Sequence, residues 1–208
     1  MCLSLVMDVS FKHPFTCMVC GPSGSGKSVF VFKLISEASE QIVPTPQKII
    51  YCYGEYQPMF ADYPQVTFQE GLPDNNDFDG KHRTLLILDD LMSEAGSEVS
   101  KIFTKISHHR NVSVIFLTQN LFYKSQRTMN LNTHYLVLFK NPRDALQVAT
   151  LGRQMYPGNS KFLVEAFKMA TEQPYGYLLI DLRADTLEKY RLRSNIFAGE
   201  RQYAYVHK

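Results

Sequence analysis

The sequence of 208 residues predicts an α/β domain built on a mostly parallel central sheet that is flanked by helices. Short apolar runs alternate along the chain with stretches of helical periodicity, which is typical of repeated strand–helix units. Two of these runs, TLLILDD at 84–90 and NVSVIFLTQN at 111–120, contain consecutive apolar residues, as strands covered on both faces do. The apolar content of 45% is sufficient for a core, and no apolar run approaches the ~18 residues of a membrane span.

The elements follow in a regular order. The expected strands are 14–21, 48–54, 66–68, 84–90, 111–120, 134–140 and 176–182. The expected helices are 27–42, 97–107, 141–154 and 160–173. The third helix has the clearest start, with Asn141 as the N-cap, Pro142 at the first helical position and Asp144 as the partner in a capping box.

Two segments are predicted to lack regular structure. Residues 71–83 are polar and predict a loop, whereas residues 185–208 predict a basic C-terminal tail with one short edge strand at most. We therefore expect one domain that covers residues 1–208. The N-terminus has neither a basic region nor a small-residue cleavage site, so it does not predict a signal peptide.

A phosphate-binding loop is the strongest motif. Gly21, Gly26, Lys27 and Ser28 match G-x-x-x-x-G-K-[ST], with a predicted strand before the motif and a helix after it. The glycines allow successive N–H groups to point inward, and the helix adds the positive end of its dipole. Lys27 is expected to reach the β- and γ-phosphates, and the Ser28 hydroxyl is expected to ligate Mg²⁺. The sequence therefore predicts that ATP and Mg²⁺ are bound by Gly21, Pro22, Ser23, Gly24, Ser25, Gly26, Lys27, Ser28 and Val29.

Two further strand ends carry polar side chains. The strand at 84–90 delivers Asp89 to the carboxyl edge of the sheet, where we expect it to hold the Mg²⁺ shell. Asp90 is the candidate for polarising an attacking water, and the alternative is that it caps the next turn. Gln119 is the candidate for contacting the γ-phosphate, and the alternative is the polar start of a loop.

The number of strands indicates a subclass. The strand at 111–118 follows the acidic strand, which favours the additional-strand (RecA/FtsK-like) type of phosphate-loop nucleotidase, with this strand between the phosphate-loop strand and the acidic strand. That class contains motor ATPases, helicases and translocases. The sequence contains no N-K-x-D motif for guanine, which argues against selectivity for GTP.

The charge is unevenly distributed along the chain. Residues 1–100 contain 6 Lys/Arg and 13 Asp/Glu, whereas residues 101–208 contain 16 and 7. This asymmetry indicates either a surface that faces a polyanion in the second half or a set of solvated helix faces. Cys17 and Cys20 form a CxxC, but in a strand such positions point to opposite faces, so we expect buried thiols and a reducing intracellular location.

A family resemblance depends on several segments taken together. These are PFTCMVCGPSGSGKS, YCYGEYQP, GLPD, LLILDDLM, FTKISHHRNVSVIFLTQNLF, HYLVLFKNPRD, LGRQMYP and GYLLIDL. With them the chain resembles the viral genome-packaging ATPases of the FtsK–HerA group over about residues 11–198, most closely those of Polinton/Maverick elements and adintoviruses. The phosphate loop is shared by many families, whereas HHRNVSVIFLTQNLF and LFKNPRD are far more specific.

The resemblance implies an ATP-hydrolysing motor that moves double-stranded viral DNA into a capsid. It implies a homo-oligomeric ring with each ATP site at a subunit interface, capsid vertex proteins as partners, and a location in the host nucleus or at the viral assembly site. The lack of a long apolar run adds the expectation that no membrane is involved. Ring ATPases of this kind use an arginine from the adjacent subunit, for which Arg110 is the first candidate, Arg143 the second and Arg127 a third. Sequence-independent contacts with the DNA backbone are expected from basic residues such as Lys101, Lys105, Lys124 and Arg127.

Two other functions remain open on the sequence. A nucleoside or nucleotide kinase would use Arg143 and Arg153 in a lid, although the inferred strand order disfavours it. A non-hydrolytic, nucleotide-dependent assembly module gains support from aspartate at position 90, where many hydrolytic ATPases have glutamate.

Overall fold

The computed structural model describes residues 9–74, 77–89, 91, 111–121, 131–143 and 145–207. Its strands are β1 (Phe11–Lys12), β2 (Thr16–Cys20), β3 (Ile42–Val43), β4 (Lys48–Tyr53), β5 (Thr67–Glu70), β6 (Thr84–Asp89), β7 (Val112–Thr118), β8 (Tyr135–Phe139), β9 (Tyr177–Asp181), β10 (Leu192–Ser194) and β11 (Tyr203–Tyr205). Its helices are α1 (Lys27–Ser36), α2 (Ala38–Gln41), α6 (Ala145–Met155) and α7 (Ser160–Ala170), with short 3₁₀ turns η1 (Pro58–Asp62) and η5 (Glu188–Tyr190). The helix expected at 97–107 lies outside the described residues.

Nine of the described strands form one sheet, in the order β11-β10-β9-β8-β2-β7-β6-β4-β5. The strands from β8 to β5 are parallel, and β9, β10 and β11 continue the sheet in antiparallel fashion. β7 lies between β2, which precedes the phosphate loop, and β6, which ends in Asp89. This order confirms the predicted α/β fold of the additional-strand type.

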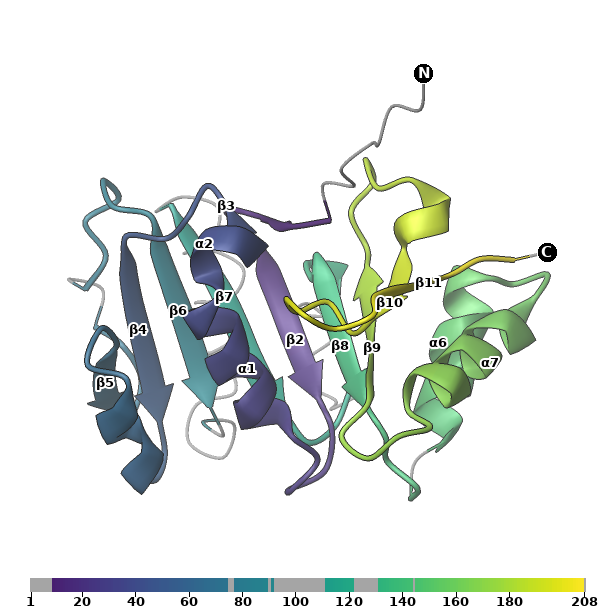
Figure 1. Ribbon diagram of the computed structural model, residues 1–208, viewed down its shortest axis with the longest axis horizontal. Coiled ribbons are helices and arrows are strands. Elements are labelled where there is room, and N and C mark those ends of the chain that lie inside the picture. Colours follow the sequence, from purple (N-terminus) through teal and green to yellow (C-terminus); the bar gives the residue numbers. More distant parts are fainter. Residues whose placement is uncertain are drawn as a thin grey trace.

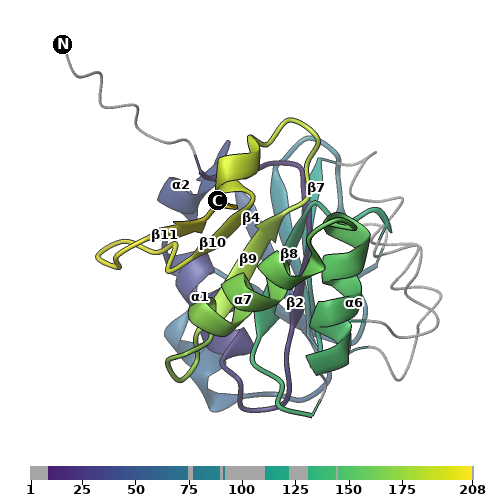
Figure 2. The same ribbon diagram turned by 90° about the vertical axis from the view of Figure 1, so that its right-hand side faces the viewer.

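The sheet separates two cores. On one face α1 packs over β2, and on the other face α6 and α7 contribute Leu151 and Leu163 to a second apolar cluster (Figures 1 and 2). Successive residues of each parallel strand point to opposite clusters, so Cys17 lies in the first and Cys20 in the second, as the spacing predicts. Both thiols are free, and burial raises the pKa of Cys20 to about 12.

The predicted helix at 27–42 is interrupted. α1 ends at Ser36, whose hydroxyl donates a hydrogen bond to the Phe32 carbonyl, and the short α2 follows. Ile42 and Val43 leave the helix to pair with β1, because two β-branched residues before Pro44 favour extended backbone. Similarly, α6 begins at Ala145 and not at Pro142, although the Asn141 side chain does accept a hydrogen bond from the Arg143 N–H. Asp144, the predicted box partner, lies outside the described residues.

The segment from 185 onward is more ordered than the prediction of a tail. It contributes two strands to the sheet, where at most one was expected, and all three residues of β10 are buried. Ile196 and Phe197 then enter the core beneath α1. The strand signal of β10 was hidden because a charged residue, Arg193, occupies a buried position.

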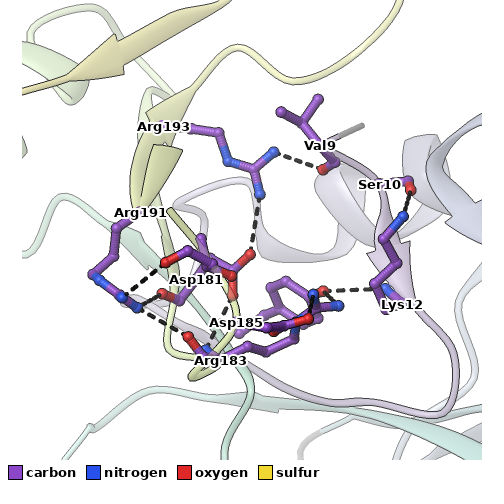
Figure 3. A network of polar contacts seen from close by, with 10 residues as sticks. Val9, Ser10, Lys12, Asp181, Arg183, Asp185, Arg191 and Arg193 are labelled. Atoms are coloured by element: carbon purple, nitrogen blue, oxygen red, sulfur yellow. Dashed lines mark hydrogen bonds and ion pairs between the residues drawn. The ribbon is translucent and has the colours of Figure 1, made fainter. Parts of the chain in front are cut away.

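That arginine belongs to a polar network at the edge of the sheet opposite the phosphate loop, which Figure 3 shows. The Arg193 Nη1 donates to the Val9 carbonyl at 2.6 Å, and its Nη2 lies 3.8 Å from the Asp181 carboxylate. The side chains of this pair are only 7% and 8% exposed. The pair therefore joins the N-terminal segment to β9 and β10.

Replacing Asp181 with alanine is expected to lower the free energy of unfolding by about 3–5 kcal/mol, since it leaves the Arg193 charge buried without its carboxylate. Chemical denaturation measures the change. Asp185→Ala is the matched control, because the Asp185 side chain is 74% exposed and its ion pair with Arg183 contributes less than about 1 kcal/mol. Equal effects of the two substitutions would contradict the assignment.

Among the described residues, none of the helices combines the length and the apolar character that crossing a bilayer requires.

Candidate active site

The carboxyl ends of the parallel strands meet at one edge of the sheet, where the arrowheads point downward in Figure 1. A cavity of about 420 Å³ opens there. It is lined by Ser23, Gly24, Lys27, Ser28, Tyr53, Gly54, Glu55, Gln57, Asp89, Leu117, Thr118 and Gln119. The structure thus brings together residues from β4, β6, β7 and the loop after β2, as expected for a ligand site in an open parallel sheet.

At two positions of the phosphate loop, the backbone has a conformation that glycine adopts far more readily than other residues. Gly24 and Gly26 have φ angles of 74° and 102°. Gly21 is required for a different reason, since a Cβ there would lie 2.7 Å from the Phe139 Cβ. The Gly21 N–H donates to the Thr118 carbonyl, which fixes the loop against β7. The first N–H groups of an α-helix have no acceptor within the helix, so the start of α1 at Lys27 supplies donors of the kind that bind anions.

Two polar groups of the loop suit an anion. The Lys27 ammonium folds back over the loop and donates to the carbonyls of Gly21 and Pro22, at 2.7 and 3.0 Å. The Ser25 Oγ is buried in the loop, and within the described part of the chain it has no hydrogen-bond partner. A phosphate in the loop would accept from both groups, so the residues present fit a triphosphate.

The predicted metal ligands, Ser28 and Asp89, line the same cavity and both interact with Tyr51. The Tyr51 hydroxyl donates a hydrogen bond of 2.6 Å to Asp89 Oδ2. Burial raises the pKa of Tyr51 far above its usual value, the Asp89 carboxylate raises it further, and a side-chain hydrogen bond with Ser28 acts in the opposite direction. The phenol is therefore a fixed donor to Asp89, and the serine and carboxylate oxygens are the hard ligands that Mg²⁺ prefers.

Tyr51→Phe is expected to raise the Mg²⁺ concentration needed for half-maximal nucleotide binding by about tenfold, because the Asp89 carboxylate loses the donor that orients it. A titration with Mg²⁺ at fixed nucleotide concentration measures this change. Tyr135→Phe is the control, since Tyr135 is equally buried but its hydroxyl bonds Lys12 and Arg183 at the other edge of the sheet. If the two variants titrate alike, Tyr51 has only a structural role.

The predicted γ-phosphate sensor, Gln119, lies directly after the end of β7. Gln119 lines the cavity beside the phosphate loop. The next residue is held in place, since the Asn120 Oδ1 accepts a hydrogen bond of 2.5 Å from the Gln147 Nε2 of α6. Gln147 also accepts from the Leu121 N–H at 2.9 Å. The sensor position is thereby connected to α6.

Not every predicted residue reaches the cavity. Arg143 is exposed in the turn before α6 and does not line it. Asp90, Arg110 and Arg127 lie outside the described residues. Of the remaining loop residues, Gly21 borders a small separate pocket of about 30 Å³, and Gly26 and Val29 border a third pocket on the far side of α1.

The sequence interpretation missed the contribution of β4. Tyr51 and Tyr53 come from this strand, and Glu55 and Gln57 follow it. Polar residues directly after a buried parallel strand were a usable signal, as they were for Asp89. Tyr51 gave no such signal, because its ring packs in the apolar core against Phe32 with ring centroids 5.2 Å apart.

Comparison with known proteins supports the fold. No family model and no curated protein matches the sequence. Among solved structures, the chain is similar to B204, the DNA-packaging ATPase of Sulfolobus turreted icosahedral virus, with a TM-score of 0.52, 15% identity, and coverage of 84% of this chain and 95% of B204. It is also similar to the pCW3 conjugation coupling protein TcpA, with a TM-score of 0.50, 13% identity, and coverage of 84% of this chain and 59% of TcpA.

These likenesses place the chain in the fold class of phosphate-loop ATPases with an additional strand. At such identities they establish the fold, and they do not transfer an activity. The first is nevertheless of the kind that the resemblance in the sequence predicts, because B204 is a viral DNA-packaging ATPase.

Proposed function

We propose that this protein is an ATP-hydrolysing motor that moves double-stranded viral DNA into a capsid. The observation that carries the proposal is the cavity in which the phosphate loop, Asp89 and Gln119 meet at the carboxyl edge of an additional-strand sheet. The structural similarity to B204 supports the same class of function. ATP and Mg²⁺ are the proposed ligands.

The residues of the site have distinct roles in this proposal. Lys27 leaves the loop carbonyls to bind the β- and γ-phosphates. Ser28 and Asp89 hold Mg²⁺, which neutralises the charge on the phosphates when it is bound. Asp90 is proposed to orient the attacking water. Glu55, like Asp89, is a carboxylate that lines the cavity. Gln119 contacts the γ-phosphate, so that loss of phosphate is transmitted through Asn120 and Gln147 to α6.

The active assembly is proposed to be a homo-oligomeric ring. Among the described residues, no arginine lines the cavity. In this proposal an adjacent subunit supplies one, which stabilises the charge on the γ-phosphate in the transition state. Arg110 remains the first candidate and Arg143 the second, since the exposed side chain of Arg143 is available to a neighbour. The basic second half of the sequence suits contacts with DNA phosphates, which are independent of sequence and weaken with salt.

The rate of phosphate release from ATP, with and without long duplex DNA, tests the proposal. We expect DNA to stimulate hydrolysis, the stimulation to decline with salt, and a mass measurement to show an oligomer that forms with nucleotide. Hydrolysis that is indifferent to DNA, in a species that stays monomeric, would contradict the motor function.

The two alternatives have their own signatures. A nucleotide kinase would transfer phosphate to a nucleoside or nucleotide and would release little of it, but the position of β7 between β2 and β6 disfavours this class. An assembly module would form oligomers with ATP and show no DNA-stimulated turnover. Analysis of the phosphorylated products, together with the mass measurement, distinguishes the three functions.

A further inference from the structure

The pocket that Gly26 and Val29 border has a volume of about 320 Å³ and lies next to the phosphate loop, on the opposite side of the first turn of α1. Its lining is Gly26, Val29, Phe30, Lys33, Phe139, Tyr175, Tyr177, Phe197 and Glu200, and we call it the aromatic pocket. Positions 26, 29, 30 and 33 share one stripe of the helix, whereas Lys27 and Ser28 face the active-site cavity. A ligand that crosses the N-terminus of α1 can therefore occupy both.

The walls of the pocket are aromatic rings held in place by the core. The Phe30 ring lies 4.9 Å from that of Tyr177 and 5.2 Å from that of Phe197, measured between centroids. At the rim Tyr175 is 72% exposed, and its φ of 62° is in the left-handed region that side chains rarely adopt. Gly176 fixes this turn, since a Cβ there would lie 2.5 Å from the Ala170 carbonyl. An exposed ring in a strained conformation beside a ligand loop is typical of a binding residue.

The pocket also contains an incomplete hydrogen-bond arrangement. The Lys33 Nζ donates to Glu200 Oε1 at 2.5 Å and lies 4.8 Å from the centre of the Phe197 ring. The other carboxylate oxygen, Glu200 Oε2, is buried and has no hydrogen-bond partner within the described residues. The Glu200 side chain is 32% exposed and lines the pocket, so its carboxylate can accept a hydrogen bond from a ligand that brings an N–H group.

We propose that the aromatic pocket binds the nucleobase and selects a purine that carries an amino group, as adenine does. This inference rests on the proposed nucleotide function. Ser28 and Asp89 fix the metal-bound end of the triphosphate in the cavity, so the nucleoside leaves the loop past Val29, which is 66% exposed at the mouth of the pocket. The purine stacks against Tyr175, and its amino group donates to the Glu200 carboxylate.

The segment that supplies Phe197 and Glu200 is the one that the sequence predicts as a tail. Base recognition by this segment gives residues 195–200 a role in the nucleotide site, in addition to their place under α1. The pocket residues come from three separate parts of the chain, around 26–33, 139 and 175–200, which is why no local motif indicates it.

Binding measurements with four ligands test the inference in the presence of Mg²⁺: inorganic tripolyphosphate, ATP, GTP, and the triphosphate of unsubstituted purine riboside, which lacks an amino group. We expect the wild type to bind ATP about tenfold more tightly than the purine riboside compound, because one hydrogen bond to a charged acceptor is lost. Glu200→Ala is expected to bring the two affinities within about twofold of each other. Weaker binding of GTP than of ATP identifies adenine as the base, and equal binding supports amino-purines in general.

Tyr175→Ala keeps Glu200 and changes an exposed side chain, so it should fold. We expect it to bind ATP and the purine riboside compound about five- to tenfold more weakly, because it loses base stacking, while its affinity for tripolyphosphate stays the same. Tyr203→Ala, which removes a partly exposed ring on β11 outside the pocket, is the matched control and should not alter any of these affinities.

The outcomes separate the pocket from the proposed function. If tripolyphosphate binds and Lys27→Ala abolishes that binding, but Tyr175→Ala and Glu200→Ala leave nucleotide affinity and selectivity unchanged, the base pocket is wrong and the phosphate site stands. If the wild type binds neither tripolyphosphate nor ATP, the proposed function itself fails.

Discussion

Replacing Lys27 with alanine is expected to reduce ATP hydrolysis at least about a hundredfold, because the γ-phosphate loses the positive charge that stabilises it during transfer. In the structure the Lys27 ammonium donates hydrogen bonds to the carbonyls of Gly21 and Pro22 in its own loop. A bound phosphate would take the place of these carbonyls as the acceptor. Release of phosphate from saturating ATP in excess Mg²⁺ measures the effect.

The fold of the Lys27 variant should persist, since the lysine contributes no side chain to either core cluster. A thermal unfolding midpoint close to that of the wild type checks this point. Lys48→Ala is the matched control: it removes the same charge at the opposite end of β4, where the Lys48 Nζ donates to the Asp77 carbonyl. Hydrolysis at the parental rate by the Lys27 variant would show that the phosphate loop is misassigned.

Replacing Asp89 with asparagine is expected to lower hydrolysis by at least about a hundredfold, because the charge that holds Mg²⁺ is lost while the shape of the side chain is kept. The amide oxygen can still accept from the Tyr51 hydroxyl, so the hydrogen bond that positions the side chain can survive. The deficit should therefore arise from the metal and not from a displaced strand.

A comparison of nucleotide binding with Mg²⁺ and with a chelator isolates this effect. The wild type should bind more tightly with Mg²⁺, whereas the two binding curves of Asp89→Asn should nearly coincide. Asp62→Asn, on the exposed surface of η1, controls for the loss of one negative charge. A variant of Asp89 that still responds to Mg²⁺ as the wild type does would remove Asp89 from the metal site.

The fold could be predicted largely because its signals are local. A strand, the glycine-rich loop and the first turns of α1 occur within residues 14–36, and the order of the acidic strand and β7 in the chain indicates the additional-strand class. The extended backbone of Ile42 and Val43 is favoured locally because these residues precede Pro44, but the pairing of β3 with Phe11 and Lys12 joins segments that are distant in sequence. β10 was missed because a charged residue within a strand argues against burial. The partners of Arg193, the Asp181 carboxylate and the Val9 carbonyl, are brought to it by the fold and are not adjacent in sequence.

The site shows the same division. The presence of Lys27, Ser28, Asp89 and Gln119 in one cavity could be predicted because each lies at or after the end of a strand, and the carboxyl ends of parallel strands share one edge of the sheet. Tyr51 could not, since a tyrosine within an apolar strand predicts core packing, and its ring does pack there while only its hydroxyl reaches Asp89.

The aromatic pocket could not be predicted either, because its lining comes from segments more than a hundred residues apart in sequence. The positive φ angle of Tyr175 and the ion pair of Lys33 with Glu200 are known only from the folded structure, and no local sequence pattern indicates them. Sequence motifs therefore indicate the proposed triphosphate site, whereas the residues proposed to position the metal ligand and to select the base are brought together by tertiary packing.

The most direct test of the central claim is a crystal structure with a non-hydrolysable ATP analogue and Mn²⁺, which takes the same oxygen ligands as Mg²⁺ and has a measurable anomalous signal. We predict an anomalous peak at bonding distance from the Ser28 Oγ, on the side that faces Asp89, with the triphosphate enclosed by residues 21–28. A metal peak elsewhere, or a nucleotide analogue bound at full occupancy away from this loop, would contradict the account.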